Sequence, residues 1–535
     1  MNPLKTIVIF CCLIATICEC KCQHVTKYSN PLMWLDMPDM SVTRSGDEFH
    51  LISTTMHLMP GAPVMKSKDL VHWEIESYVF DSLTDNSKYN LINGSVYGRG
   101  QWASSIRFHQ GKYYVLFSPN DQPYRSYIYT SDTPAGKWKL LTRSQHFHDA
   151  SLFFDDDGRV YVFYGTGSLR ELNSDLSGVK EGGVDKQIFE RDSTETGLLE
   201  GSQVIKYKGK YYLLMISWPN NKPRRQVCYR ADKITGPYEK KVILEDTFAG
   251  FPYVGQGCII DDKNGNWHAL IFQDRGAVGR VPLLMPVRWE NGWPMLGDKQ
   301  GKVPANGNVP LPSFDSGKRI IESDEFQEAN LKINWQWNHN PENGYWTLKE
   351  RPGYLRLKTN RIVPNLYLAP NTLTQRMEGP VSSGTIALDI SKMKDGDIAG
   401  FAAFNGHSGV LSAVKEGTRK FLVLTSEEVN LSEKEKAVLG VDSKENARLE
   451  IKNDLIYLRI DVDFNLGKDW AYFYYSEDNK HWNRIGAPFK MIFDYRKLFM
   501  GTRFAIFNYA TKSVGGYVDI DFFRFTKDID PKQPR

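Results

Sequence analysis

The chain has 535 residues, with 67 Lys and Arg against 63 Asp and Glu, which leaves a net charge of +4. This balance excludes a nucleic-acid binder that depends on a broad positive field. A content of 41% hydrophobic and 13% aromatic residues excludes a disordered chain. At a nominal ~150 residues per domain the length allows three or four domains, but two all-β domains of ~200–250 residues fit equally well.

The first 22 residues predict a secretory signal. Lys5 precedes an apolar run from Ile7 to Ile17, which is too short to span ~30 Å of hydrocarbon but suits the core of a signal peptide. No later segment is apolar enough to cross a membrane. We therefore expect residues 1–22 to be removed and the protein to be exported to the periplasm.

Five of the seven cysteines lie in this leader: Cys11, Cys12, Cys18, Cys20 and Cys22. Lipid anchoring through one of the last three is the alternative to soluble export, although none follows the small residue that a lipobox favours. Cys228 and Cys258 remain, without a metal-binding spacing. One disulfide between them is conceivable, but two buried thiols are the favoured interpretation.

One pattern recurs five times along residues 23–310: an apolar strand, a turn that ends in Gly, and an aromatic-rich strand. The turn glycines are 65, 47, 51 and 56 residues apart, close to the length of a four-stranded propeller blade: Gly46, Gly111, Gly158, Gly209 and Gly265. The repeat predicts a five-bladed β-propeller. Chance repetition within an ordinary sandwich is the alternative.

A stretch rich in Pro, Gly and Asn, residues 303–312, predicts a linker. Beyond it, residues 320–535 form a second β-rich region that ends in an alternating strand near residues 515–525. Its size suits a two-sheet sandwich. The predicted fold class is all-β, with a five-bladed propeller followed by a β-sandwich.

Carboxylates occur at matched positions in the repeat. Asp149 and Glu200 each stand nine residues before a turn glycine, as Trp102 and Gln256 do, and Asp39 stands seven before its own. The innermost strands of a propeller line one funnel, so these side chains should converge at one end of it. The alternative is that such acids cap turns on a solvated rim, but three at matched positions favour a site.

Carboxylates gathered in a concave site repel one another and lose hydration, which separates their pKa values and hence their roles. Glycosidic bond cleavage needs such a pair, an acid for the leaving oxygen and a base for the attacking water, ~6.5–9.5 Å apart in an inverting enzyme. The pattern therefore favours a glycosidase.

Five segments resemble motifs of glycoside hydrolase family 43: residues 38–41, 101–103, 148–158, 199–201 and 279–280. The resemblance implies roles for one residue in each: Asp39 as general base, Trp102 in the subsite wall, Asp149 as modulator of the acid, Glu200 as general acid, and Arg280 as a substrate contact near the base. It also places Met56 and His57 where relatives have pocket-lining side chains.

The chain departs from the family pattern at several positions. Met40, Ser104 and Ser202 replace prolines, and Gln256 stands where many relatives have a His near a central metal or water. None of these changes removes a carboxylate. The loss of the His makes a metal less expected, so we predict that no metal or cofactor is required, with a structural calcium possible.

The second domain resembles the concanavalin-like C-terminal module of β-xylosidases and arabinofuranosidases, in residues 335–346 and 350–357. In those relatives one loop of the module closes the sugar pocket, which implies exo action. For Trp335, Trp337 and Trp346 we expect core and interface packing in preference to sugar stacking.

The resemblance implies an exo-acting, inverting hydrolase that releases terminal α-L-arabinofuranosyl residues from oligosaccharides of arabinoxylan or xyloglucan. A β-D-xylosidase, or an enzyme with both activities, is the alternative. A propeller that only binds glycans is a different class, against which the complete carboxylate trio argues. The expected partner is an oligosaccharide, and the oligomeric state stays open.

Overall fold

The computed structural model describes residues 25–434 and 436–530. The predicted signal peptide and its cysteines lie outside the described residues. The all-β prediction is confirmed, since helix in the described part is limited to four 3-10 turns: η1 (Ser87–Asn90), η2 (Gly276–Val278), η3 (Asn343–Tyr345) and η4 (Leu366–Leu368). Among the described residues, no helix has the length and apolar character needed to span a membrane.

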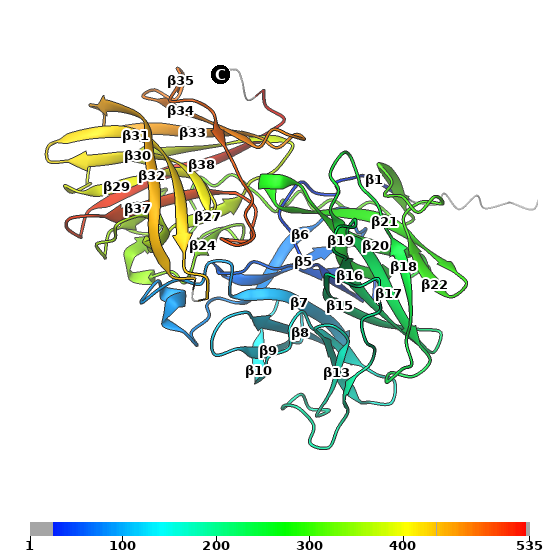
Figure 1. Ribbon diagram of the computed structural model, residues 1–535. Helices are drawn as coiled ribbons and strands as arrows, with labels where there is room; N and C mark the ends of the chain where they lie inside the picture. The colour runs from blue at the N-terminus through cyan, green and yellow to red at the C-terminus, as the bar shows by residue number, and fades with distance from the viewer. Residues whose placement is uncertain (1–24, 435, 531–535) are drawn as a thin grey trace, which may run out of the picture.

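Five four-stranded antiparallel sheets form the predicted propeller, the lower and right-hand lobe of Figure 1. Each innermost strand contacts the next around a ring that closes from the fifth to the first: β2 (Ser41–Ser45), β7 (Gln101–His109), β11 (Ser151–Phe154), β15 (Leu198–Tyr207) and β19 (Val254–Asp261). The five predicted turn glycines follow these strands, with φ between 59° and 82°. Only Gly adopts such angles without steric cost, so each hairpin is encoded locally.

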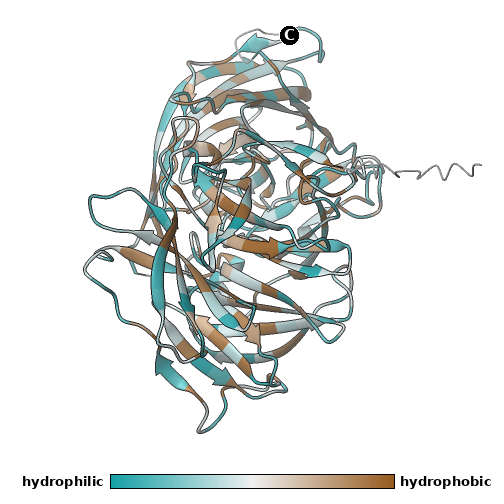
Figure 2. Cartoon of the chain, turned by 90° about the vertical axis from the view of Figure 1, so that its right-hand side faces the viewer, coloured by the Kyte–Doolittle hydropathy of each residue, from teal (hydrophilic) through white to brown (hydrophobic). Residues whose placement is uncertain are grey.

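Three further strands complete each blade. They are β3 (Glu48–Ile52), β5 (Gly61–Ser67) and β6 (Glu74–Phe80); β8 (Lys112–Pro119), β9 (Arg125–Ser131) and β10 (Lys139–Gln145); β12 (Val160–Tyr164), β13 (Ser168–Leu172) and β14 (Asp185–Gln187); β16 (Lys210–Trp218), β17 (Arg225–Ala231) and β18 (Glu239–Leu244); and β20 (Trp267–Asp274), β21 (Arg280–Glu290) and β22 (Trp293–Leu296). Strands such as β16 are buried along nearly their whole length. Figure 2 shows apolar segments along the strands and hydrophilic ones along many loops.

The predicted linker contains a strand. β23 (Asn306–Val309) pairs with β1 (Thr26–Ser29), which joins the two ends of the propeller region. The Tyr28 ring lies so close to Gly307 that a Cβ there would come within 2.3 Å of it. This stretch of Pro, Gly and Asn is therefore ordered by a partner distant in the sequence.

The C-terminal lobe consists of two packed sheets with an apolar core between them. One sheet has the order β32 (Val438–Ile451), β31 (Arg419–Leu431), β30 (His407–Glu416), β29 (Asp397–Phe404), β37 (Arg503–Ala510), β27 (Leu373–Arg376), β24 (Gln336–Asn338) and β4. The other has the order β25 (Trp346–Thr347), β26 (Leu355–Lys358), β38 (Tyr517–Lys527), β28 (Val381–Asp389), β33 (Leu455–Asp463), β34 (Trp470–Ser476) and β35 (Asn483–Arg484), with β36 (Phe489–Lys490) beside β34. The expected packing role is confirmed for Trp335 and Trp337, which are buried in this core.

A strand of the propeller region completes the first sandwich sheet. β4 (Leu58–Met59) pairs with β24, Met59 opposite Trp337 and Leu58 opposite Asn338. A strand of two residues is too short to show an alternating pattern in the sequence, so this pairing was not predicted. It joins the two lobes by backbone hydrogen bonds close to the funnel.

Cys228 and Cys258 are both buried and free. The interpretation of two separate thiols is confirmed, and the alternative of one disulfide between them is wrong.

Candidate active site

The predicted site residues lie where the innermost strands begin, and the backbone there is irregular. Asp39 and Asp149 each precede their strand by two residues and have positive φ, 56° and 47°. The ladders of β7, β15 and β19 shift register at Trp102, Glu200 and Gln256. Bulges redirect side chains that would otherwise face a neighbouring blade. Irregular backbone of one kind or the other therefore occurs at the predicted site residue of each blade.

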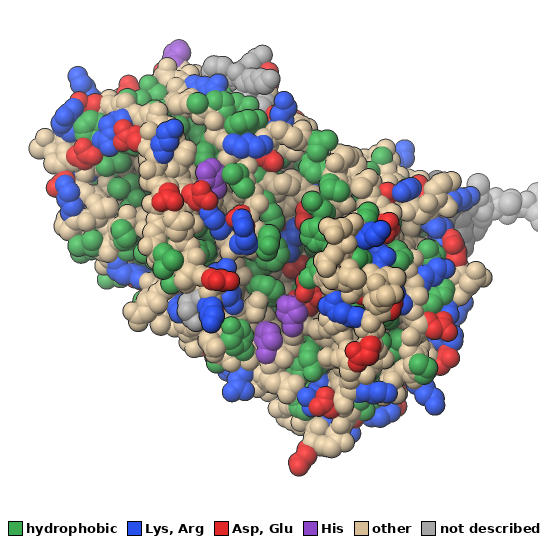
Figure 3. Space-filling view, viewed as in Figure 1, with side chains coloured by type: hydrophobic (Ala, Val, Ile, Leu, Met, Phe, Trp, Pro, Cys, Tyr) green, Lys and Arg blue, Asp and Glu red, His purple; other side chains and the backbone are tan. Residues whose placement is uncertain are grey.

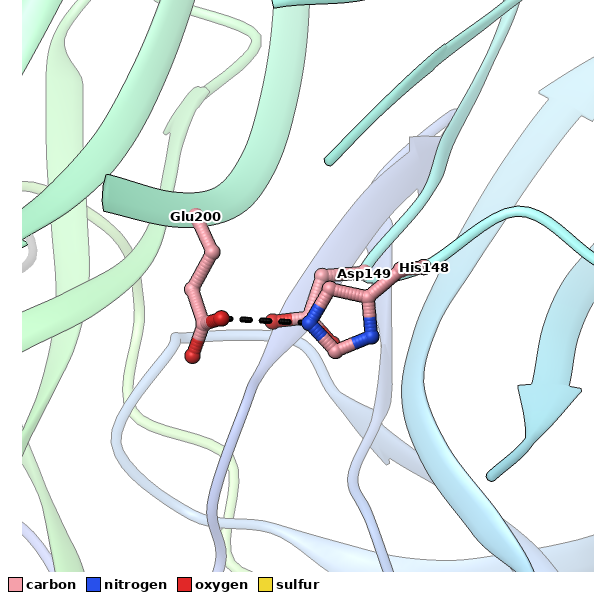
Figure 4. A group of neighbouring side chains, drawn as sticks. All are labelled: His148, Asp149 and Glu200. Atoms are coloured by element: carbon pink, nitrogen blue, oxygen red, sulfur yellow. Dashed lines mark hydrogen bonds and ion pairs between the residues drawn. The ribbon is translucent and has the colours of Figure 1, made fainter. Parts of the chain in front are cut away.

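Asp149 and Glu200 meet at His148 (Figure 4). The His148 Nε2 atom lies 3.1 Å from Glu200 Oε2 and 4.0 Å from Asp149 Oδ1. The Glu200 side chain is 27% exposed, whereas that of Asp149 is 6% exposed. Glu200 is therefore the carboxylate that a substrate can reach, and Asp149 lies behind it. Figure 3 shows acidic and histidine side chains gathered in the hollow between the two lobes.

Asp39 lies on another side of the funnel and is paired with Arg280. The Arg280 Nη1 atom is 3.3 Å from Asp39 Oδ1, and both side chains are more than nine-tenths buried. The Arg280 backbone N–H donates to Asp36 Oδ1 at 2.8 Å. Because the arginine is held at its backbone and at its guanidinium, it fixes the orientation of the Asp39 carboxylate.

Burial and neighbouring charges shift the acid–base properties of the pocket. Burial raises the pKa of Asp39, and the positive charge of Arg280 opposes this rise. Burial and the nearby Glu200 carboxylate raise the pKa of Asp149 to about 8. For His148, burial lowers the pKa, but the hydrogen bond to Glu200 and the Asp149 charge outweigh it and raise the pKa to about 9. His148 and Asp149 thus both have raised pKa values beside the more exposed Glu200 carboxylate.

A loop of the C-terminal lobe, residues 491–502 between β36 and β37, forms a wall of the pocket. The Phe499 carbonyl accepts a hydrogen bond from Arg280 Nη2 at 3.2 Å, and the Phe499 ring lies over the same guanidinium at 4.3 Å. The Trp102 ring contacts Phe499 and His148, with centroids 6.0 and 5.8 Å away. An aromatic wall from both lobes therefore borders the carboxylates.

The remaining predicted contacts are placed differently. Gln256 is buried and packs so closely on Gly201 that a Cβ there would lie 2.7 Å from its side chain. Met56 lies against a small cavity that Arg280 and Phe499 also line. Met56 and Gln256 are thus beside the site but nearly inaccessible.

His57 lies at the interface of the lobes. It is fully buried, with its ring 4.8 Å from that of Tyr97 and 5.0 Å from that of His339. Because His57 is fully buried there, none of its atoms is accessible to a sugar. The structure therefore gives His57 an interface position in place of the predicted pocket-lining one.

Among the residues that the structure describes, His148, Asp149 and Glu200 bring ligand atoms within 4.8 Å of one another and could hold a metal ion. An ion on Glu200 would displace the proton that an acid must donate, so a metal here conflicts with the predicted role of Glu200. The absence of a metal requirement stays a prediction, which retained activity in a chelator would support.

Sequence reasoning missed two residues of this site. His148 stands next to Asp149 in a matched motif, and that adjacency was the available signal. Phe499 lies 299 residues after Glu200 in a loop with no repeat, so its approach depends on the docking of the two lobes.

Two family models match the chain. The model for glycosyl hydrolases family 43 matches residues 28–294, and that for the β-xylosidase C-terminal concanavalin A-like domain matches residues 323–526. A bifunctional GH43-CE structure from Bacteroides eggerthii has a TM-score of 0.85 and 41% identity; the match covers 94% of this chain, which spans 64% of that protein.

Two curated relatives carry different names. A β-xylosidase of Formosa agariphila is 29% identical, over 94% of this chain and 90% of its own length. A non-reducing end α-L-arabinofuranosidase of Bacteroides ovatus is 30% identical, over 63% of this chain and 65% of its own length. The carboxylates in the funnel, both domain matches and these likenesses lead to one conclusion: the chain belongs to glycoside hydrolase family 43 and is a glycosidase.

Proposed function

We propose that the protein is an exo-acting, inverting hydrolase that releases a terminal pentose from hemicellulose oligosaccharides. One observation carries this proposal: Asp39, Asp149 and Glu200 lie in one funnel. Phe499, from the other lobe, forms a wall of that funnel. In this proposal Asp39 accepts a proton from the attacking water, and Arg280 orients it. Glu200 protonates the leaving oxygen, with His148 3.1 Å from its carboxylate and Asp149 beside it as modulator.

α-L-Arabinofuranose and β-D-xylose are the two candidate sugars. Arabinofuranose is our first choice and xylose the second, and the Bacteroides ovatus relative supports the first by its name. The Formosa agariphila relative, matched over a larger share of the chain, supports xylose. Nitrophenyl α-L-arabinofuranoside and β-D-xyloside, tested side by side, distinguish them by release of nitrophenol. Oligosaccharide affinity without release from either would favour a glycan-binding propeller.

The stereochemical outcome tests the inverting mechanism. Proton NMR of the first product formed, before mutarotation, should show the anomer opposite to that of the substrate. Product with retained configuration would contradict the role of Asp39 as base, because retention requires a carboxylate nucleophile.

Exo action predicts that single pentoses appear from the first minutes of digestion of a xylo-oligosaccharide or arabinoxylan oligosaccharide. Early release of internal fragments would contradict it. Export to the periplasm remains part of the proposal, and cell fractionation with and without residues 1–22 tests it.

A further inference from the structure

Apolar side chains are exposed beside the proposed acid. Trp218 and Leu198 are each 38% exposed and lie opposite each other in the β15–β16 ladder, where Glu200 lies opposite Ile216. Side chains on a strand alternate between faces and rise by ~3.3 Å per residue. Trp218 is two residues beyond Ile216 on its strand, so its backbone lies about 7 Å further toward the end of the ladder than the residue paired with Glu200.

A second exposed ring comes from the next blade. Tyr253, directly before β19, is 39% exposed, and its ring centroid is 5.1 Å from that of Trp218 with an angle of 52° between the planes. We call these two rings, Trp218 and Tyr253, the aromatic platform. It spans the seam between the fourth and fifth blades.

A buried arginine holds the platform in place. The Arg224 side chain is 5% exposed, and its Nη2 atom is 2.5 Å from Asp274 Oδ2 and 3.2 Å from the Tyr253 carbonyl. Its guanidinium lies 5.3 Å from the centroids of both platform rings. An ion pair and two cation–π contacts thus order these rings before any ligand arrives, which lowers the entropic cost of binding.

We propose that the aromatic platform binds the leaving-group sugar of the substrate, a xylopyranose unit of a xylo-oligosaccharide chain. This inference rests on the proposed function, since the acid donates its proton to the oxygen that joins the released pentose to the rest of the substrate. The next sugar must therefore extend away from the pocket past Glu200. Exposed, preordered rings about one sugar length away offer an apolar surface to the C–H face of a pyranose.

The experiment compares two substrates that share the released sugar. Methyl β-D-xyloside has a leaving group too small to reach the platform, whereas xylotriose reaches it. Methyl α-L-arabinofuranoside and arabinofuranosyl-xylotriose form the equivalent arabinose pair. In Trp218→Ala, kcat/KM for the oligosaccharide should fall about tenfold relative to that for the methyl glycoside, and Trp218→Phe should retain most of it.

Controls separate stacking from damage to the fold. Tyr253→Ala, in a loop, repeats the test at the second ring. Tyr345→Ala removes an aromatic that is 43% exposed on the other lobe and should leave the ratio unchanged. An unchanged ratio in Trp218→Ala, or an equal fall for both substrates, would overturn the platform while leaving the hydrolase proposal intact.

Failure of the proposed function gives a different result. If the wild type cleaves none of these four glycosides, calorimetry with xylotriose tests the platform by binding alone. Weaker binding to Trp218→Ala would still support it. Equal binding, or no binding to the wild type, would overturn it.

Discussion

The propeller and the C-terminal sandwich border the same pocket in different ways. The propeller provides Asp39, Asp149 and Glu200 at the starts of three innermost strands, on backbone that bulges or has positive φ. The sandwich provides Phe499, on a loop that Arg280 anchors through a hydrogen bond and a ring contact. In the proposed mechanism, the chemistry therefore comes from the propeller and the shape of the pocket from the sandwich. Variants in the two lobes should fail in different ways.

The largest effect is expected from the propeller carboxylates. On a glycoside with an alcohol leaving group, Glu200→Gln and Asp39→Asn should each lower kcat about 10²–10⁴-fold, because they remove proton transfer and conserve shape. Circular dichroism and thermal unfolding should show intact folds. Activity near that of the wild type on that substrate, in either variant, would contradict the assignment of chemistry to this lobe.

A smaller effect is expected from the sandwich loop. Phe499→Ala should lower kcat/KM roughly tenfold to a hundredfold, because the wall that positions the sugar and the Arg280 guanidinium is lost. Ile492→Ala is the matched control, since Ile492 is on the same loop and 47% exposed. Equal losses in both variants would show that the loop acts only as a whole.

Arg280→Gln should shift the pH dependence of the propeller chemistry. Burial raises the pKa of Asp39 and the Arg280 charge opposes the rise, so removing that charge raises the pKa further. The base must be ionised, and the acid limb of the kcat/KM profile should therefore move toward higher pH. A limb that stays in place would exclude Arg280 as a determinant of the Asp39 charge.

The smallest effect concerns stability. Burial and Glu200 raise the pKa of Asp149 from 3.8 to about 8. A raised pKa gives a contribution to stability that is complete below pH 3.8 and is lost as the pH rises to about 8. Asn cannot ionise, so Asp149→Asn should exceed the wild type in Tm by about 2–4 °C at pH 8 and by less at pH 5.

The control for this prediction is Asp132→Asn, because the Asp132 side chain is 83% exposed. Its Tm should follow that of the wild type at both pH values. A lower Tm for Asp149→Asn at pH 8 would show that the Asp149 carboxylate stabilises the fold through His148 more than its burial opposes it.

The sequence predicted features that local patterns encode. Five turn glycines predicted the blades, and spacing from them predicted Asp149, Glu200 and Trp102 in one funnel. It could not predict features that arise from docking: β4 in the sandwich sheet, β23 in the linker, or Phe499 over Arg280. The prediction that His57 lines the pocket failed for the same reason. Its local sequence does not show whether the side chain faces the pocket or the interface between the lobes.

The central claim is that Glu200 is the acid and Asp39 the base, and glycosides with different leaving groups test it most directly. A dinitrophenolate leaving group departs without protonation, whereas a methoxide leaving group must be protonated to depart as methanol. Glu200→Gln should keep most of its activity on the dinitrophenyl glycoside and lose about 10²–10⁴-fold on the methyl glycoside, while Asp39→Asn should lose similar activity on both. Equal losses for Glu200→Gln on the two substrates would contradict the account.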